Sequence, residues 1–593
     1  MDDKNGAALL EDNKKLGLAL SGGGFRASFF HIGVLAQLAH LGLLRQVEVI
    51  STVSGGSIIG ALYYLHLKRL LEEKTDDEII DDDYTNIVKR IERDFLQAVQ
   101  RNLRMMTYCD WRKNWRMAAP DYSRSDRLGE LYDEHFYRPL MPAQAGKMIQ
   151  MKDLYIHPKV DPGPDGQRDL EFRPRKDNGG RKAKVPIILI NATALNNGHN
   201  WRFEASTMGE PRADDEISLD LDKNLRLQRP PSYDAMIKRQ QDFALGYAVA
   251  ASACVPGIFN PLAVSDLYAD IRVELVDGGV HDNQGVQGLI DEENRCNLLI
   301  VSDGSGQMRD EDNPHTWLAA VLNRSQGIFM KRIREEQLHH VMQGWSGRVA
   351  FFHLRQGLPP RVSPWNAADD APARGLEKER SFERDPFGVD EKVQELLSNI
   401  RTDLDSFTEV EAYSLMLDGY LVSGHVLAQT EAFTELACTS RQPKPEDWEF
   451  MKIQPWLEKP TAQYRRHLRA AERQFFKVLR LNTPLAAGAL GLLALFLWWL
   501  VFKSPVADLR IDFSVQSALI MALLAAVGCL LPNVIRSFPS LSFFTRPTRW
   551  LAAYLGKAAL PVLATFPVRL HLKWIDPLFL RMGQINRLRP PSQ

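Results

Sequence analysis

The sequence has few cysteines, and their placement argues against two kinds of structural site. The five cysteines are odd in number and widely scattered among 593 residues, with no CxxC pair and no Cys/His ligand spacing. This distribution indicates neither a disulfide framework nor a zinc site. The first fifteen residues also lack an apolar run, so we expect no cleaved signal peptide. A reducing, cytosolic setting for the N-terminal part fits these features best.

An excess of charge of one sign is also missing. The 73 basic and 74 acidic residues leave a formal net charge of -1, so no overall field favours nucleic acid, and we expect no such partner. The acidic stretch Asp76–Asp83 lacks the glycine-punctuated spacing of a calcium loop and is most simply a solvated loop. No GxxxxGK[ST] or GxGxxG motif occurs, which disfavours nucleotide binding.

Long apolar runs are confined to the C-terminal part. Residues 484–502 form an uncharged run of 19 residues, about the length that spans a bilayer core, and residues 514–531 form a second run. Lysine and arginine are concentrated before the first run and after the second, with few between them. By the positive-inside rule, this pattern predicts a two-helix membrane hairpin with both flanks on the cytoplasmic side. Two buried helices of a soluble domain are the alternative, which the absence of charge disfavours.

The most informative stretch is residues 16–56. It reads as a strand at Leu16–Leu20, a glycine loop at Ser21–Gly24, a helix, a second strand at Val47–Ser51 and a tight turn at residues 53–56 that leads into another helix. Ser54 in that turn has the setting of an activated nucleophile, a strand-to-helix elbow followed by Gly55 and Gly56. Thr52 stands where the first glycine of a G-x-S-x-G motif usually lies.

The chemistry of Ser54 needs a base and an oxyanion site. Gly22, Gly23 and Gly24 offer unencumbered backbone amides for the second role, although such a turn can also hold a phosphate. None of the fourteen histidines is a compelling base. Asp277 is more attractive because it ends a hydrophobic strand and is followed by Gly278 and Gly279, but an aspartate there is equally well explained as a turn cap.

His31 and His281 each have two interpretations. His31 is expected to be a packed residue of the first helix. His281 follows the strand-end glycines, where it can either approach a site or simply face solvent.

The rest of the chain alternates strands and helices, which indicates an α/β layered fold with a mainly parallel sheet. Residues 185–192, 271–276 and 297–302 read as further strands, and residues 391–429 as helical. Residues 86–150 have helical periodicity and suit a cap or insertion. Within them Tyr108–Arg116 mixes aromatic and basic residues, which fits cap packing with snorkelling arginines better than a lipid-headgroup patch.

Three motifs in one order resemble the patatin-like phospholipases. They are GGGFR at residues 22–26, STVSGGS at 51–57 and DGG at 277–279. Further similar stretches lie at residues 191–196, 251–259 and 301–303, and the resemblance spans roughly residues 14–305. It implies a three-layer α/β fold with a mainly parallel central sheet and helical insertions, to which the residues above add the C-terminal transmembrane region.

The resemblance also implies roles for individual residues. Ser54 would be the nucleophile and Asp277 its proton acceptor in a Ser–Asp dyad, with the oxyanion held by the amides of the three glycines at 22–24. Arg26 matches the arginine of the family's glycine-rich box, and both a structural and a headgroup-binding role stay open. Thr52 and Ala27 depart from the family pattern but are small enough to fit. The scheme requires no metal and no diffusible cofactor.

These expectations give a domain plan and a function. The plan has a catalytic domain at 14–305 with insertions at about 67–184 and 205–238, a helical extension and charged linker at 306–480, and a membrane region at 481–593. The expected function is hydrolysis of fatty acyl esters of membrane lipids through an acyl-Ser54 intermediate. A membrane lipid acyltransferase and a catalytically inactive lipid-binding protein are the alternatives.

Overall fold

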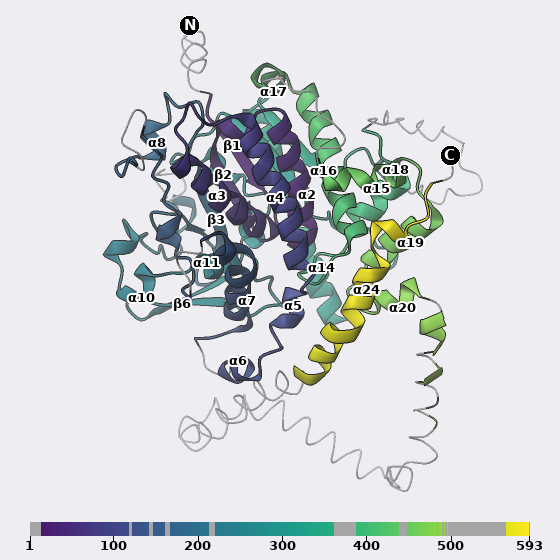
Figure 1. Cartoon of the computed structure of the whole chain (residues 1–593). Helices are drawn as coiled ribbons and strands as arrows, with labels where there is room; N and C mark the ends of the chain where they lie inside the picture. The colour runs from purple at the N-terminus through teal and green to yellow at the C-terminus, as the bar shows by residue number, and fades with distance from the viewer. Residues whose placement is uncertain are drawn as a thin grey trace, which may run out of the picture.

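The computed structural model describes most of the chain before residue 482 and a short C-terminal segment. The described residues are 14–117, 121–141, 146–160, 167–212, 220–360, 387–437, 448–482, 484–488, 491, 492, 495, 498 and 565–591. In Figure 1 a central sheet is covered by long helices, and the C-terminal helix lies beside the green helices of residues 454–481.

Within the described residues the sheet has nine strands, of which five form a parallel core in the order β3-β2-β1-β8-β9. Antiparallel strands extend it past β3, where β4 pairs with β3 and β5 with β4. The hairpin β6–β7 joins through β7, which also pairs with β3. The strands are β1 (Leu16–Leu20), β2 (Val47–Val53), β3 (Ile187–Ala194), β4 (Asn200–Phe203), β5 (Met208–Gly209), β6 (Leu262–Tyr268), β7 (Ile271–Asp277), β8 (Leu298–Asp303) and β9 (Val349–His353).

Helices cover both faces of this sheet. The larger core lies on one face, where side chains such as Leu18 and Ile50 pack against α2 (Gly24–His40), α3 (Gly55–Glu73), α4 (Asp81–Val99), α11 (Leu245–Ser252) and α16 (Glu409–Gln429). The alternate strand residues, including Ala19 and Val49, face a smaller core with α13 (Gln287–Ile290) and α14 (Leu318–Gly344). This alternation gives the expected three layers, with strands that are apolar on both faces.

Shorter helices complete the cap and the C-terminal part. They include α5 (Leu103–Met106), α6 (Trp111–Arg116), α7 (Arg124–Tyr132), α8 (Pro174–Asp177), α10 (Lys238–Gln241), α12 (Gly279–Asp282), α15 (Glu391–Ser398), α17 (Glu431–Leu436), α18 (Gln454–Glu458), α19 (Ala462–Ala471), α20 (Lys477–Leu481), the π-helical turn η11 (His571–Ile575) and α24 (Asp576–Met582).

The fold continues past residue 305 without a break in the core. Strand β9 extends the parallel sheet, and α16 packs closely on α2. A Cβ at Gly33 of α2 would overlap the carbonyl oxygen of Met416, and one at Gly419 of α16 would overlap that of Phe30. Glycine on both helices therefore allows their backbones to approach directly.

Two expectations about local structure were wrong. The acidic stretch 76–83 is not all loop, because its last three residues open α4, where their charge favours the helix N-terminus. The helical stretch 391–429 is broken into α15 and α16 by a ten-residue segment, 399–408. The break has a structural role, since this segment lies over the glycine turn at the start of α2.

Among the described residues, no helix is both long and apolar enough to cross a bilayer. The predicted membrane segment 514–531 lies outside the described residues, and 484–502 is described only in part. The membrane hairpin therefore stays a prediction.

Candidate active site

Ser54 lies at a strained elbow between β2 and α3. Its backbone has φ 51° and ψ −116°, a conformation that costs a non-glycine residue free energy and that is concentrated at functional sites. The elbow is packed against the neighbouring turn, so that a Cβ at Gly55 would overlap the carbonyl oxygen of Gly24 and one at Gly56 that of Leu20. The two glycines after the serine are thus required by close approach.

Strand β3 brings Asp277 to the serine. Val53, the last residue of β2, pairs with Asn191, and Asp277, the last residue of β7, pairs with the next residue, Ala192. Because β2 runs parallel and β7 antiparallel to β3, the two strands meet end to end along the same edge of β3. The Ser54 elbow and Asp277 are therefore juxtaposed by one shared strand.

This arrangement corrects the expected direction of β7. We expected Asp277 to end a strand of a mainly parallel sheet. It does end a strand, but β7 enters antiparallel as the second half of the β6–β7 hairpin. The hairpin was not predicted from the sequence. Because β7 runs antiparallel to β3, its last residue meets the end of β2 head-on, beside Ser54.

The two carboxyl oxygens of Asp277 differ in their hydrogen bonding. The Asp277 side chain is buried, with its residue 5% exposed, and Oδ1 accepts a hydrogen bond from the Gly279 amide (2.7 Å). Oδ2 has no hydrogen-bond partner within the described part of the chain. Burial raises the pKa of Asp277 to about 6, and the Gly279 amide and the neighbouring Ser54 hydroxyl oppose that rise.

The glycine turn presents backbone amides beside the serine. A Cβ at Gly22 would lie 3.2 Å from the Cβ of Ser54. The Gly22 amide is already engaged, because it donates to the carbonyl oxygen of Asn283 (3.0 Å). The amides of Gly23 and Gly24 have no acceptor among the described residues. Two of the three predicted glycine amides are thus available to an oxyanion.

Comparison with family profiles identifies the domain family of residues 18–290. A family profile described as patatin-like phospholipase matches residues 18–290. Residues 18–290 form a patatin-like phospholipase domain. A search of curated protein sequences gave no match.

Solved structures similar to the chain include human GIVD cytosolic phospholipase A2 bound to methyl gamma-linolenyl fluorophosphonate and terbium chloride. That structure is 14% identical, the match covers 72% of this chain and 61% of the human chain, and the TM-score is 0.36. VipD from Legionella pneumophila is 12% identical over 98% of this chain and 94% of its own, with a TM-score of 0.27. The match thus spans about three fifths of the human enzyme, and likeness at this level carries no functional argument.

Arg26 of the patatin-like domain has a structural role in this state. Its side chain is buried and donates to the carbonyl oxygens of Gly304 (3.2 Å) and Ile400 (2.7 Å). Burial and the nearby Arg309 lower its pKa to about 10. Arg26 thereby ties the glycine turn to the end of β8 and to the segment 399–408.

Ser252, at the end of α11, was not singled out from the sequence. Its hydroxyl accepts from the Ser54 amide (2.9 Å) and donates to the Asn191 carbonyl oxygen (2.6 Å). It thus links the strained elbow to β3. The only sequence signal was its place in the stretch 251–259 that resembles the family.

The two departures from the family pattern are accommodated by glycines elsewhere. A Cβ at Gly60 would lie 2.6 Å from the methyl group of Thr52, so glycine on α3 makes room for the threonine. The Thr52 hydroxyl donates to the Leu189 carbonyl oxygen (2.9 Å). Ala27 packs against Gly304, where a Cβ would also be too close.

The histidines lie outside the dyad. His31 is a packed residue, as predicted, with ring nitrogens at hydrogen-bond distance from the Ser302 hydroxyl (2.7 Å) and the Ser21 carbonyl oxygen (3.0 Å). Burial lowers its pKa to about 4, so the ring is neutral near pH 7. His281 is neither at the dyad nor fully exposed, because it lines a polar cavity of about 530 Å³ together with His199.

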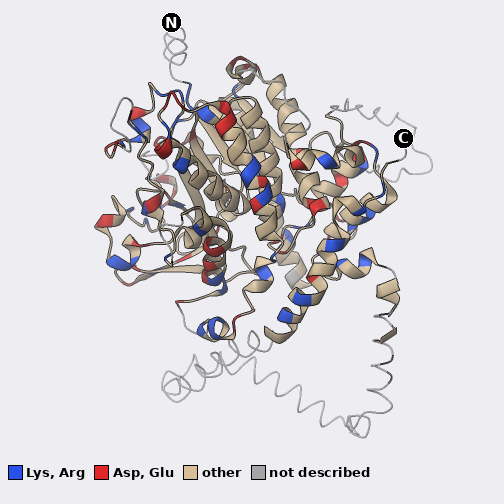
Figure 2. Ribbon diagram, viewed as in Figure 1, with Lys and Arg blue, Asp and Glu red and all other residues tan. Residues whose placement is uncertain are grey.

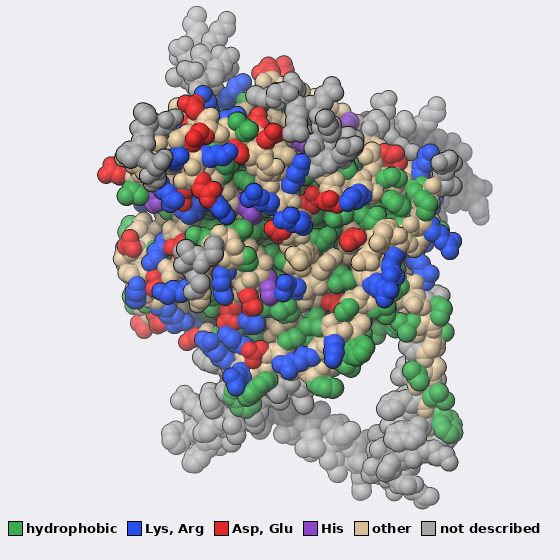
Figure 3. Space-filling model, in the orientation of Figure 1, with side chains coloured by type: hydrophobic (Ala, Val, Ile, Leu, Met, Phe, Trp, Pro, Cys, Tyr) green, Lys and Arg blue, Asp and Glu red, His purple; other side chains and the backbone are tan. Residues whose placement is uncertain are grey.

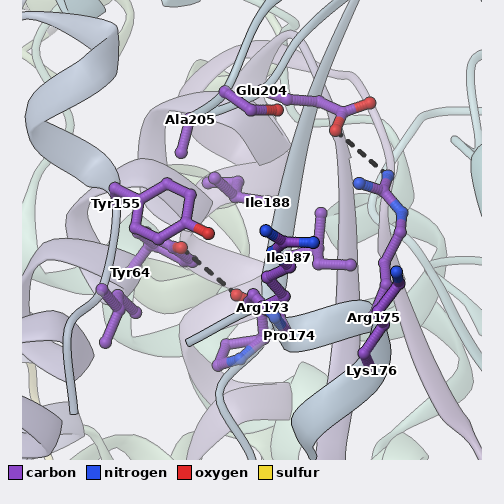
Figure 4. A pocket seen from close by; sticks show the side chains of 13 residues that line it. Tyr64, Tyr155, Arg173, Pro174, Arg175, Lys176, Ile187, Ile188, Glu204 and Ala205 are labelled. Atoms are coloured by element: carbon purple, nitrogen blue, oxygen red, sulfur yellow. Dashed lines mark hydrogen bonds and ion pairs between the residues drawn. The ribbon is translucent and has the colours of Figure 1, made fainter. Parts of the chain in front are cut away.

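A separate cavity of about 250 Å³ lies at the other end of β3. It is lined by Tyr64 and Tyr155 together with basic side chains, and the Tyr64 hydroxyl donates to the Pro186 carbonyl oxygen (3.2 Å) (Figure 4). Pro186 precedes β3, whereas Asn191, which pairs with the last residue of β2, lies past the middle of the strand. This cavity is therefore distinct from the dyad, whose Ser54 is 4% exposed.

Proposed function

We propose that the chain is a serine lipid acyl hydrolase that cleaves fatty acyl esters of membrane phospholipids or lysophospholipids. The observation that carries this proposal is the end-to-end meeting of β2 and β7 on β3, which juxtaposes a strained serine and a buried carboxylate with a free oxygen. The patatin-like phospholipase profile supports the substrate class.

In the proposed mechanism, Oδ2 of Asp277 accepts the hydroxyl proton of Ser54 while Oγ attacks the ester carbonyl carbon. The amides of Gly23 and Gly24 donate to the resulting oxyanion, and the N-terminus of α2 adds a favourable field. The alcohol leaves with the proton held by Asp277, which forms the acyl-serine. Asp277 then takes a proton from water while the water oxygen attacks the acyl carbon. As the bond to Oγ breaks, Asp277 returns this proton to Oγ, which releases the fatty acid and restores Ser54 and the carboxylate.

We further propose that the C-terminal apolar runs anchor the enzyme to the membrane as a two-helix hairpin, with the catalytic domain on the cytoplasmic side. The support comes from the sequence, namely two uncharged runs with basic flanks. Anchoring holds the dyad beside its substrate and raises the effective substrate concentration.

The test is release of fatty acid from phospholipid vesicles by the full-length protein. Ser54→Ala and Asp277→Asn should each lower turnover at least about a thousandfold, because the two groups act as a unit. Asp270→Asn makes the same change at the exposed turn between β6 and β7 and should leave turnover unchanged. Turnover retained by either dyad variant, with folding verified by circular dichroism, would exclude the proposed dyad.

A further inference from the structure

Helix α14 projects beyond the edge of the sheet where the dyad lies. Near its C-terminus, Trp345 donates to the carbonyl oxygen of Cys296, just before β8 begins (3.0 Å). Arg334 donates to the side chain of Asp303, the last residue of β8 (2.8 Å). The helix therefore runs antiparallel to β8, and Leu318–Arg334 extends about 24 Å past the carboxyl end of that strand.

The projecting half of α14 exposes large apolar side chains. Leu318 is 75% exposed and Phe329 is 67% exposed. Val321, Leu322 and Ile328 lie on the same half, and the exposed Trp317 immediately precedes it. A contiguous set of this kind on a soluble surface marks a site of contact with a protein or a lipid.

Two more apolar elements come from distant parts of the chain. Trp111 on α6 is 55% exposed, although Arg116 stacks on the cap residue Tyr122 (4.3 Å) as the expected cap packing requires. Trp574 on η11 is 64% exposed. The segments are held together because Arg569 donates to the Cys109 carbonyl oxygen (2.6 Å) and Asn114 to the Thr565 hydroxyl (3.0 Å). They lie side by side at the bottom of Figure 1.

Basic side chains accompany these tryptophans. Arg112 and Arg116 on α6 and Arg569 and Lys573 at η11 are exposed, and blue segments mark both elements in Figure 2. Figure 3 shows hydrophobic and basic side chains together along this lower edge. Exposed aromatic side chains among lysine and arginine are typical of elements that lie in the interface of an anionic membrane.

These elements lie at the catalytic end of the molecule. The Asp403 carbonyl oxygen accepts from the Phe25 amide at the glycine turn (3.0 Å). Three residues later, Ser406 donates to Asp576 (2.7 Å), which also accepts from Asn102 (2.7 Å). The start of α24 is thereby fixed to the same segment that covers the glycine turn.

The positions of the two ends of the predicted membrane hairpin indicate that this surface faces a lipid bilayer. The described residues of the first predicted membrane segment include Leu485, Leu492 and Leu495, all with exposed side chains. The chain re-enters at Thr565, against α6. Between residues 498 and 565 lies the second predicted membrane segment, so the ends of the hairpin flank this face.

We infer that the projecting half of α14, α6 and residues 566–575 form one docking face that rests on a bilayer containing anionic phospholipid. The inference deepens the proposed function, on which it rests, because it turns the catalytic edge of the sheet toward the membrane. On α14 the contact is made mainly by exposed apolar side chains, and Arg324 there is paired with Glu311 (3.3 Å). The contact with anionic headgroups belongs to α6 and η11.

The experiment is photo-crosslinking of the full-length Ser54→Ala protein in phosphatidylcholine–phosphatidylglycerol vesicles that contain a diazirine phosphatidylcholine. Peptide mapping should find lipid adducts in residues 317–333, 108–117 and 566–575. It should find none around Leu170, which is 72% exposed but lies near α8, away from this face. Because this variant is not required to turn over, the result does not depend on hydrolase activity.

A second measurement uses the active protein. Leu322→Asp with Phe329→Asp should lower fatty acid release from vesicles at least about tenfold relative to turnover of a water-soluble ester by the same variant. Leu170→Asp, the matched control, should leave this ratio unchanged. Adducts absent from 317–333 and 108–117, or a protein–protein crosslink there in place of lipid, would overturn the docking face. If the lipid adducts form as expected but the wild type hydrolyses neither the vesicle lipid nor the soluble ester, the proposed function is overturned and the docking face stands.

Discussion

The raised pKa of Asp277 sets the lower pH limit of the proposed reaction. Burial places this pKa at about 6, and only the ionised carboxylate can accept the Ser54 proton. We expect kcat/KM to fall about tenfold for each pH unit below 6 and to level off above it. A pH–rate profile with a soluble ester measures this fall of kcat/KM at acidic pH. An unchanged rate down to pH 4 would show that Asp277 is not the base.

The same burial means that ionised Asp277 lowers the stability of the folded protein, because the folded state binds the proton more tightly than the unfolded chain does. The folded protein holds a proton on Asp277 up to about pH 6, whereas the unfolded chain releases it near the ordinary value of 3.8. Stability contributed by this group therefore falls as pH rises through that window. Asp277→Asn should be more stable than the wild type by up to about 3 kcal/mol at pH 8, with little gain at pH 4. Urea unfolding at the two pH values tests this difference, with Asp270→Asn as the control.

At the scale of elements, the segment 399–408 holds the glycine turn in place and is itself held by Arg401. The Arg401 side chain is 1% exposed, donates to Asp405 (2.8 Å) and forms an ion pair with Glu411 (2.5 Å). The Asp403 carbonyl oxygen in this segment meets the Phe25 amide at the start of α2. The glycine turn is thus positioned by a part of the chain nearly four hundred residues away.

Removal of the Arg401 side chain should therefore reduce both stability and activity. Arg401→Ala leaves the buried carboxylates of Asp405 and Glu411 with less compensation, which typically costs about 3–5 kcal/mol. We expect a lower urea midpoint and reduced ester turnover in the fraction that stays folded. Arg93→Ala removes an exposed arginine paired with Asp94 and should leave both unchanged. Equal midpoints for Arg401→Ala and the wild type would contradict this role.

Local patterns in the sequence predicted the first strand, turn and helix closely. The features that were missed depend on pairing between segments far apart in the sequence. Leu16–Leu20 is a strand and α3 begins at Gly55, as expected, because strand, turn and helix signals follow one another within forty residues. The β6–β7 hairpin was missed, although its second strand was predicted. Its pairing with β3 depends on where β2 ends, which no local pattern encodes. Ser252 was missed for the same reason, since its role exists only beside Ser54 and Asn191.

At the scale of the whole molecule, the catalytic edge, the projecting half of α14 and both ends of the predicted hairpin lie toward one end. If the apolar runs anchor the protein, alkaline carbonate should leave the full-length chain in the membrane pellet. Leu492→Arg with Leu523→Arg places a charge in each run and should release the protein. A wild-type chain in the supernatant would contradict the hairpin. Substitution is preferable to truncation because residues after 565 pack on the body, as Asp576 does on Asn102.

The central claim is that Ser54 is a nucleophile activated by Asp277, and covalent labelling tests it most directly. The full-length protein is treated with a fluorophosphonate, and the modified residue is located by peptide mass spectrometry. We expect a single adduct, on Ser54, which disappears in Ser54→Ala and forms at least about a hundredfold more slowly in Asp277→Asn, with Asp270→Asn unaffected. An adduct on a different serine, or equal labelling rates in Asp277→Asn and the wild type, would contradict the account.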